Sequence, residues 1–259
     1  MITEKVHFKN SRSMDLAGIV DREDLSGGKM PAVIICHGFT LFKEFKPLHH
    51  LAQTLASNGF ASLRFDFSDC RGESGGRCED MMVSHQVNDL ISAVNFLEKL
   101  DYIDSGRIGV AGHSLGGFTA IVTATTDKRL KAVVSISSPA RAETQNLFNE
   151  STEKKWMDDG ILNFNTYKKG HVKLHYSFME DLKEYDGTKI IKEVHVPIRL
   201  IHGQNDAIVP VENAEALYKN ANQPKELMLI PDADHLFLKE PYMGKMIAAS
   251  TDWFKRHLP

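Results

Sequence analysis

The sequence predicts an α/β protein with a mostly parallel, eight-stranded sheet, helices on both faces and a small cap insert after the sixth strand. Short β-rich runs alternate with helix-length segments, which is the pattern of a parallel sheet covered on both sides. The central runs, such as residues 32–35, are continuously apolar and so fit strands that are buried on both faces. A length of 259 residues with 42% hydrophobic residues is enough for one such domain with a sizeable core.

The alternation places the expected strands and helices along the chain. The strands are expected at residues 5–9, 16–21, 32–36, 61–66, 107–111, 132–137, 198–202 and 226–230. Helical periodicity is clearest over residues 83–100, where apolar residues beginning with Val87, Leu90 and Ile91 recur at spacings of three and four. The other helices are expected at residues 48–58, 115–126, 212–220 and 241–257.

One segment, about residues 139–190, interrupts this alternation. It is polar and lysine-rich and shows no obvious buried strand, yet it is rich in aromatic residues: Phe148, Trp156, Phe164, Tyr167, Tyr176, Phe178 and Tyr185. That enrichment predicts a small cap over the active site rather than a linker, and we expect most of the rings to form the core of the cap itself. The chain is thus expected to be a single domain over residues 1–259 that carries a cap insert.

Composition excludes several classes of protein. The formal net charge is -3 and no dense Lys/Arg block occurs, which argues against a nucleic-acid partner. No run of about 18 apolar residues is present and the first residues do not resemble a signal peptide, so we expect a cytoplasmic protein with no membrane partner. The three cysteines, Cys36, Cys70 and Cys78, fit reduced thiols better than a disulfide framework, although Cys70 and Cys78 could pair in an oxidising compartment.

The run from Gly112 to Gly116 reads G-H-S-L-G and predicts a nucleophile elbow at Ser114. An expected strand comes directly before it and an expected helix directly after it. In such an elbow the serine sits on a sharp turn that exposes its hydroxyl, and the glycines two residues away on either side leave room for the neighbouring backbone.

A serine nucleophile needs a base, and the base needs an acid to orient it. Asp206 follows the expected strand at 198–202 and His235 follows the one at 226–230, which gives the chain order Ser, Asp, His that is typical of α/β-hydrolases. Asp232 is the weaker candidate for the acid, because a residue so close to His235 in sequence is poorly placed to reach its far ring nitrogen. We therefore predict Ser114, Asp206 and His235 as the catalytic residues.

Residues 37–40, His-Gly-Phe-Thr, predict the loop that supplies an oxyanion hole. The backbone N–H of Phe39, together with that of Leu115, is expected to face the oxygen that becomes negative in the tetrahedral intermediate. Gly38 would let the backbone approach closely.

Other motifs predict neither a cofactor nor a metal. The glycine-rich run at residues 72–76 lacks the Gly-Lys-Ser/Thr ending of a phosphate loop and is expected to shape a loop beside the active site. The pairs His49 with His50 and His171 with His175 have no carboxylate or cysteine set of ligand spacing nearby. We expect the reaction to need no metal or organic cofactor.

Four segments together resemble the α/β-hydrolase superfamily across nearly the whole chain: CHGFT at 36–40, FDFSDCRGES at 65–74, GHSLGG at 112–117 and HGQND at 202–206. More narrowly, the chain resembles bacterial cinnamoyl or feruloyl esterases in its length, its HGF-type loop and its short insert. The resemblance implies hydrolysis of hydroxycinnamoyl esters (feruloyl, caffeoyl or p-coumaroyl), with the insert closing over the aromatic acyl group and Gln145, Trp156 or Tyr167 lining the pocket. Dienelactone hydrolases carry cysteine and haloalkane dehalogenases aspartate in place of Ser114, which points away from both chemistries.

The function expected from the sequence is therefore that of a serine carboxylesterase acting through an acyl-enzyme. Its partner is a small-molecule ester, and a homodimer is left open. One alternative is a serine aminopeptidase or acylpeptidase, although neither the acidic anchor nor the added domain usual in such enzymes is visible. A monoacylglycerol lipase would want a more apolar lid. A non-catalytic ligand receptor on the same fold would be expected to have lost a member of the triad.

Overall fold

The predicted α/β architecture is confirmed by the computed structural model, which describes residues 1–24, 28–141, 146–166 and 170–259. Eight strands form the main sheet in the order β1-β2-β4-β3-β5-β6-β9-β10. Their bounds are β1 (Ile2–Lys9), β2 (Asp15–Arg22), β3 (Met30–Cys36), β4 (Ala61–Phe65), β5 (Ile103–His113), β6 (Leu130–Ile136), β9 (Ile198–Gly203) and β10 (Lys225–Ile230). Only β2 runs against the others, since β1 and β4 each pair with it antiparallel and every other neighbouring pair is parallel.

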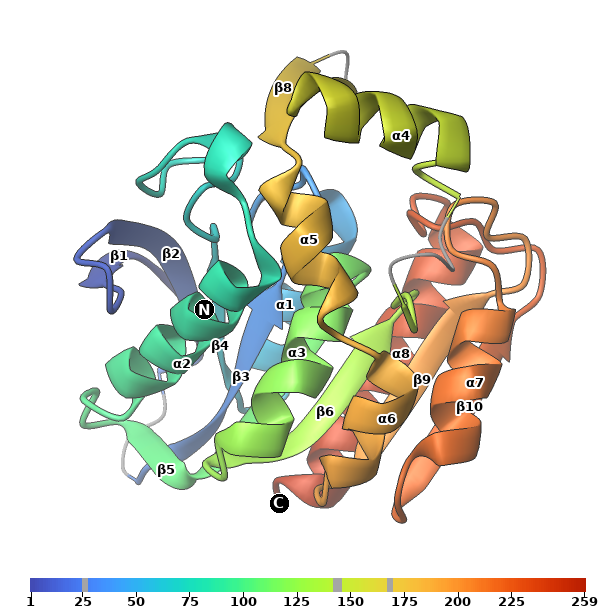
Figure 1. The fold of residues 1–259 in the computed structure, drawn as a ribbon. Helices are drawn as coiled ribbons and strands as arrows, with labels where there is room; N and C mark the ends of the chain where they lie inside the picture. Colours follow the sequence, from blue (N-terminus) through green and yellow to red (C-terminus); the bar gives the residue numbers. More distant parts are fainter. Residues whose placement is uncertain (25–27, 142–145, 167–169) are drawn as a thin grey trace.

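Two layers of helices enclose the sheet, as Figure 1 shows. The helices are α1 (Lys46–Ala56), α2 (Val83–Leu97), α3 (Leu115–Thr126), α4 (Glu150–Asp159), α5 (Ser177–Lys183), α6 (Gly187–Ile190), α7 (Glu212–Asn220) and α8 (Glu240–His257), with 3-10 turns at Cys78–Asp80 and Ile191–Glu193. Helices α1 and α8 pack together on one face, whereas α2, α3, α6 and α7 follow one another across the opposite face. All five helices expected from the sequence are present.

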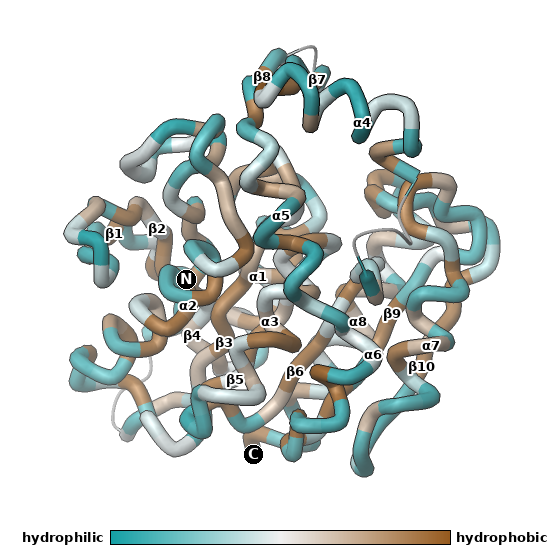
Figure 2. The backbone as a smooth tube through the Cα atoms, viewed as in Figure 1, coloured by the Kyte–Doolittle hydropathy of each residue, from teal (hydrophilic) through white to brown (hydrophobic). Residues whose placement is uncertain are grey.

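The central strand β3 explains why the sequence reads as a continuous apolar run. Val33 and Ile35 enter the core under α1 and α8. Ile34 and Cys36 enter the core on the other face, among side chains of α2 and α3. Because successive side chains of a strand point to opposite faces, a strand with a core on each side must be apolar at every position. In Figure 2 the hydrophobic residues are concentrated in these central strands, and the hydrophilic residues lie toward the outside of the molecule.

Strand β5 begins earlier than the apolar pattern indicates, at Ile103 rather than residue 107. Ile103 pairs with Met30 of β3, and the register shifts before the next pair, Ala32 with Ile108. The stretch between them is polar and partly exposed, so hydrophobic patterning does not reveal it.

The insert between β6 and α6 holds α4, a two-stranded sheet and α5. Strands β7 (Ile161–Thr166) and β8 (Gly170–His175) pair antiparallel, so the segment in which the sequence shows no obvious buried strand holds a mostly exposed hairpin. In β8 only Val172 and Leu174 are buried, so the hairpin hides one narrow apolar edge within a polar sequence. Figure 1 shows α4 and β8 at the top of the view, apart from the helices that flank the sheet.

The insert leaves and rejoins the core at a single point. The N–H of Gly187, the first residue of α6, donates to the carbonyl of Ala140 at 2.8 Å. Next to this bond, the Arg141 guanidinium pairs with the Asp186 carboxylate at 3.1 Å. We refer to residues 141–186 as the cap and to the Ala140–Gly187 bond as its neck.

The three cysteines are free thiols, with Cys36 and Cys70 buried. Burial raises the pKa of the Cys70 thiol well above its usual value. In the part of the chain that the structure describes, no helix combines the length and the apolar character needed to cross a bilayer.

Candidate active site

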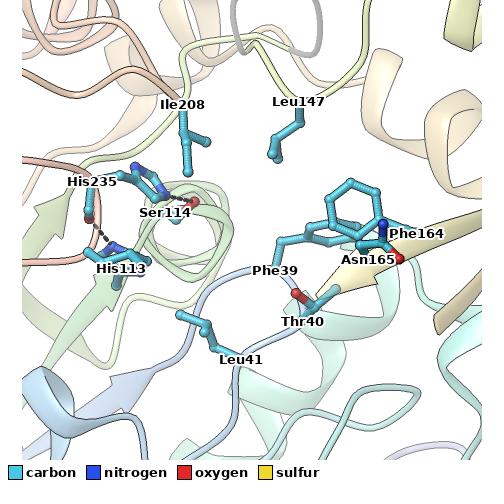
Figure 3. Close-up of a pocket in the computed structure, with 11 residues that line it drawn as sticks. Phe39, Thr40, Leu41, His113, Ser114, Leu147, Phe164, Asn165, Ile208 and His235 are labelled. Carbon is cyan, nitrogen blue, oxygen red and sulfur yellow. Dashed lines mark hydrogen bonds between the residues drawn. The ribbon is translucent and has the colours of Figure 1, made fainter. Parts of the chain in front are cut away.

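The structure brings Ser114, His235 and Asp206 together from three loops at the carboxyl ends of parallel strands of the main sheet. Ser114 follows β5, Asp206 follows β9 and His235 follows β10. Nε2 of His235 lies 3.1 Å from Oγ of Ser114, and its Nδ1 lies 2.7 Å from Oδ2 of Asp206. Figure 3 shows the first of these bonds. Because a carboxylate only accepts, Nδ1 carries the hydrogen, and the lone pair on Nε2 faces the serine hydroxyl.

Ser114 sits on the strained turn that the G-x-S-x-G motif predicts. Its backbone has φ 55° and ψ −122°, a region that side chains other than glycine avoid at a cost of about 1–3 kcal/mol. The flanking glycines allow the close approach. A Cβ on Gly112 would lie 2.2 Å from the carbonyl oxygen of Gly116, and one on Gly116 would lie 2.3 Å from that of His37. The turn therefore fits between β3 and the start of α3 only because both positions lack a side chain.

We expect Gly116→Ala to lower the free energy of unfolding by at least ~2 kcal/mol, because the backbone of β3 must move to admit the methyl group. Gly244→Ala is the matched control. Gly244 lies in α8 with nothing within 4 Å of an added Cβ, so this change should raise stability by about 0.5–1 kcal/mol. Urea unfolding of both variants measures the difference. Equal stability in the two variants would contradict the close approach at the elbow.

Asp206 is held as a fully accepting carboxylate. Its Oδ1 accepts from the N–H groups of Ile208 and Val209 at 2.9 and 2.8 Å. Its Oδ2 accepts from His235 and lies 3.3 Å from Nε2 of His202, which also donates to the carbonyl of Val209 at 2.8 Å. Burial alone would raise the pKa of Asp206, but the hydrogen bonds from His202 and His235 lower it by more than burial raises it. The pKa of this carboxyl therefore lies well below its usual value. Asp206 therefore remains charged and fixes the His235 ring.

Two backbone N–H groups close to Ser114 in the chain or across from it have no partner among the described residues. Phe39 lies in the loop after β3, and Leu115 is the first residue of α3. Among the described residues, no hydrogen bond engages the N–H of either one. The loop approaches the elbow closely at Gly38, where an added Cβ would lie 3.0 Å from Cβ of Ser114. This arrangement leaves both donors free for an oxygen bound beside Ser114.

The loop that carries Phe39 is anchored to the loop after β4. His37 is buried, its Nδ1 donates to the carbonyl of Gly38 at 2.9 Å, and its Nε2 accepts from the N–H of Phe67 at 3.1 Å. Asp66 accepts from the backbone and from Nζ of Lys43, both at 2.7 Å. Gly72 packs against Asp66, with an added Cβ only 2.3 Å away. The glycine-rich run thus packs against the loop after β4, which in turn anchors the loop of Phe39.

Two buried histidines near Ser114 are held in the neutral form. Burial lowers the pKa of His37, and burial followed by the nearby His235 lowers the pKa of His113 to about 3. The ordinary histidine value of 6.5 applies in the unfolded chain. Below pH 6.5 the unfolded chain therefore takes up protons that the folded chain does not, and stability falls as the pH falls.

We expect the free energy of unfolding to decrease from pH 6.5 toward pH 5, by about 2 kcal/mol at pH 5 for His113 alone. Urea unfolding at several pH values measures this slope. His113→Gln should flatten it, whereas His171→Gln, at an exposed position of β8, should leave it unchanged. A native slope that His113→Gln does not alter would contradict the neutral state of His113.

A pocket of about 250 Å³ opens next to Ser114 and His235. Its other lining residues come from the end of β5, the Phe39 loop, the Asp206 and His235 loops and the cap: His113, Phe39, Thr40, Leu41, Ile208, Leu236, Leu147, Phe164 and Asn165. Figure 3 shows the side chains of Ile208 and Leu147 above the space beside Ser114, and those of Phe39 and Phe164 on its side opposite His235. Among the described residues, no Asp, Glu, Lys or Arg side chain lines this pocket. It therefore suits an uncharged, apolar group.

The cap packs on the ring of Phe39. Phe178 stacks on that ring with a centroid distance of 5.3 Å, Phe164 meets it edge-on at 5.2 Å and Phe148 meets it edge-on at 6.0 Å. Trp156 contacts Phe148 and Phe178 in turn. The expectation that the cap aromatics pack mostly with one another is confirmed, and one residue of the predicted oxyanion loop joins their cluster.

Of the three residues expected to bind substrate, the structure describes only Trp156, which does not line the pocket. Trp156 is 1% exposed, and its Nε1 donates to the carbonyl of Leu174 at 2.9 Å, so it lies inside the cap rather than along the pocket. Gln145 and Tyr167 lie outside the described residues.

Sequence reasoning missed most of the residues that line the pocket. Ile208 and Leu236 lie within two residues of Asp206 and His235, so their place on the same loops could have pointed to them. Leu147 and Phe164 gave no such indication, because their position depends on how the cap folds. Among the described residues, no group of three or more His, Cys, Asp or Glu side chains is arranged to hold a metal ion.

Comparison with known proteins finds relatives over most of the chain. A model of the prolyl oligopeptidase family matches residues 48–259. The Bacillus subtilis (strain 168) protein YitV, described as a candidate esterase, is 29% identical over 248 residues, which cover 88% of this chain and 90% of YitV.

Solved structures share the fold. The α/β-hydrolase GrgF from Penicillium sp. sh18 superimposes with a TM-score of 0.85 at 17% identity, covering 100% of this chain and 99% of GrgF. Est1E from Butyrivibrio proteoclasticus, solved with ferulic acid, has a TM-score of 0.82 at 23% identity, covering 97% of this chain and 98% of Est1E.

Proposed function

The chain belongs to the prolyl oligopeptidase family, and from that premise we propose that this α/β-hydrolase is a serine carboxylesterase that cleaves neutral esters with apolar acyl groups. One observation carries the proposal. Ser114, His235 and Asp206 form a hydrogen-bonded series beside an apolar pocket. The loop of Phe39 and the start of α3 next to it carry two backbone N–H groups that have no partner among the described residues. Such a site can activate a hydroxyl, hold an uncharged acyl group and stabilise an oxyanion.

In the proposed reaction, Oγ of Ser114 attacks the ester carbonyl while Nε2 of His235 takes the hydroxyl proton. Asp206 keeps the His235 ring oriented and stabilises the imidazolium that forms. The oxyanion accepts from the N–H groups of Phe39 and Leu115, where one such donor is worth roughly 2.7–4 kcal/mol. His235 then returns the proton to the leaving alcohol, which frees the alcohol and leaves an acyl-enzyme. Water, activated by the same base, releases the acid and restores Ser114.

A hydroxycinnamoyl group is the acyl substituent that we propose. Phe39 and Phe164 give the pocket an aromatic wall, on which a planar aromatic acid can pack edge-on or stacked. The fold relative Est1E was solved with ferulic acid, which supports the same class of ligand for this pocket.

A substrate panel tests the function directly. We expect hydrolysis of p-nitrophenyl acetate, butyrate and octanoate, of methyl ferulate and of chlorogenic acid, with the highest kcat/KM for the hydroxycinnamoyl esters. Preference for octanoate would replace the hydroxycinnamoyl assignment with an alkyl one. Failure to hydrolyse any ester in the panel would contradict the proposed function.

Phe164→Ala removes the part of the aromatic wall that the cap supplies. We expect KM for methyl ferulate to rise about tenfold, since burial of an aromatic ring is worth about 1.5–3 kcal/mol, and KM for p-nitrophenyl acetate to stay within about twofold. Phe96→Ala, at a half-buried ring that stacks on Phe8 far from the pocket, is the matched control. An equal change for both substrates would count against contact between Phe164 and the acyl group.

A serine peptidase is the second candidate, because the family is named for a peptidase. The described lining residues offer no carboxylate to bind a substrate amine, which favours the esterase. Aminoacyl p-nitroanilides set against the matching aminoacyl esters distinguish the two functions. Faster cleavage of the anilides would identify a peptidase.

A further inference from the structure

The loop that carries His235 is tied to the strand of the nucleophile by one side chain. Nε2 of His113 lies 2.7 Å from the backbone carbonyl oxygen of His235, and Figure 3 shows this bond. Among the described residues, no second donor reaches that carbonyl. His113 is the last residue of β5 and directly precedes Ser114. The hydrogen bond therefore connects the loop of the proposed base with the residue next to the proposed nucleophile.

The chemistry of this bond fixes the proton on the His113 ring. A carbonyl only accepts, so Nε2 must carry the hydrogen, and in a neutral ring Nδ1 is then a bare lone pair. Nδ1 is buried and has no hydrogen-bond partner in the described part of the chain. The backbone of Gly38 lies against it, since an added Cβ there would be 3.0 Å from Nδ1. A second proton at Nδ1 would find no acceptor, in agreement with the pKa lowered to about 3.

His113 therefore touches all three parts of the site. Its backbone continues into Ser114, its Nε2–H holds the His235 loop and its Nδ1 edge faces the Gly38 loop. Its ring is packed between Phe45, at a centroid distance of 5.6 Å, and the ring of His235, at 4.8 Å. A charged ring so close would repel the imidazolium that His235 becomes during the reaction, whereas a neutral ring does not.

We propose that His113 is a positioning residue for the ester hydrolysis proposed above, and that its Nε2–H sets the place of His235 relative to Ser114. The inference rests on the proposed function. It assigns to His113 no proton transfer and no contact with substrate. Loss of the bond should displace the base without emptying the pocket, and a misplacement near 1 Å costs about 10²-fold in rate. The loss should therefore fall on kcat and leave KM nearly unchanged.

Two replacements separate positioning from packing. His113→Leu removes the donor, and we expect kcat for p-nitrophenyl butyrate to fall about 100-fold with KM within about threefold. His113→Gln places an amide N–H near the position of Nε2, and we expect it to keep kcat within about tenfold of the native value. Val94→Ala, in buried α2, serves as a stability control, because it should lower the melting temperature and leave kcat unchanged.

A spectroscopic measurement tests the placement of the proton without any substrate. In protein labelled with ¹⁵N-histidine, the His113 ring should show a protonated Nε2 and a bare Nδ1, unchanged between pH 8 and pH 5. A proton on Nδ1, or titration of His113 within that range, would overturn the proposal.

The kinetic outcomes are equally decisive. Native kcat in His113→Leu, or an equal loss in the Leu and Gln variants, would also overturn the proposal. Failure of the proposed function gives a different result, because the native protein would then react neither with esters nor with a fluorophosphonate at Ser114. The ¹⁵N spectrum would still show which nitrogen of the His113 ring carries the proton.

Discussion

Ser114→Ala is expected to reduce kcat/KM for p-nitrophenyl butyrate by about 10⁵-fold or more, to the residual rate that a bound substrate has beside an intact oxyanion hole. The variant loses the atom that attacks the carbonyl in the proposed reaction, and among the described residues no other hydroxyl is hydrogen-bonded to Nε2 of His235. The alanine also removes the hydroxyl from a backbone that stays in its unusual conformation. Stopped-flow measurement of p-nitrophenol release quantifies the loss, and a fluorophosphonate should no longer label the protein.

Ser135→Ala is the matched control for this replacement. Ser135 is buried in β6, in register with Gly112 of the elbow, and its Oγ has no hydrogen-bond partner in the described part of the chain. Its removal should leave both rate and stability close to the native values. If Ser114→Ala keeps native activity, or if Ser135→Ala loses as much, the assignment of the nucleophile is wrong.

Asp206→Asn should lower kcat by about 10⁴-fold, with a much smaller effect on KM. The amide can point its N–H groups at Nδ1 of His235, where two donors would then meet. This would favour the tautomer that carries its hydrogen on Nε2, which cannot accept the proton of Ser114. The charge that stabilises the imidazolium is lost as well. Because the carboxylate also accepts from Ile208 and Val209, the variant should unfold at lower urea concentration.

Asp232→Asn provides the comparison, since Asp232 is the other acid considered for this role. It lies in the His235 loop with φ 60°, a conformation that asparagine tolerates as well as aspartate does. The structure joins Nδ1 of His235 to Asp206, so we expect Asp232→Asn to keep kcat within about twofold. Loss of activity in Asp232→Asn with activity retained in Asp206→Asn would transfer the acid role to Asp232.

The sheet and the three converging residues could be predicted because their positions depend on local rules. Buried strands are apolar throughout, and residues at the carboxyl ends of parallel strands meet at one edge, so Ser114, Asp206 and His235 follow from their order along the chain. The glycines of the elbow indicate that two backbone segments approach each other more closely than any larger residue would allow. These features need no knowledge of how distant side chains pack.

The cap could not be predicted in the same way. Its hairpin buries only alternate residues such as Val172 and Leu174, and its strands are too short and too polar to stand out. The sequence shows that Trp156 is aromatic but does not predict that its indole N–H donates to the carbonyl of Leu174 inside the cap. Which ring faces the substrate depends on the packing around Phe39, a contact between segments more than 100 residues apart.

The neck formed by Ala140 and Gly187 makes the cap a replaceable module. Because the inserted segment departs and returns at one hydrogen-bonded pair, a foreign lid with adjacent ends can be grafted there without changing any strand order. A graft must also replace the contacts of the present cap with the core, since β8 packs on the 3-10 turn Cys78–Asp80 and α5 packs on α2. The new lid must also pack against the Phe39 ring, because this ring contacts the cap on one side and lines the pocket on the other. The Phe39 side chain therefore links the choice of lid to the shape of the pocket.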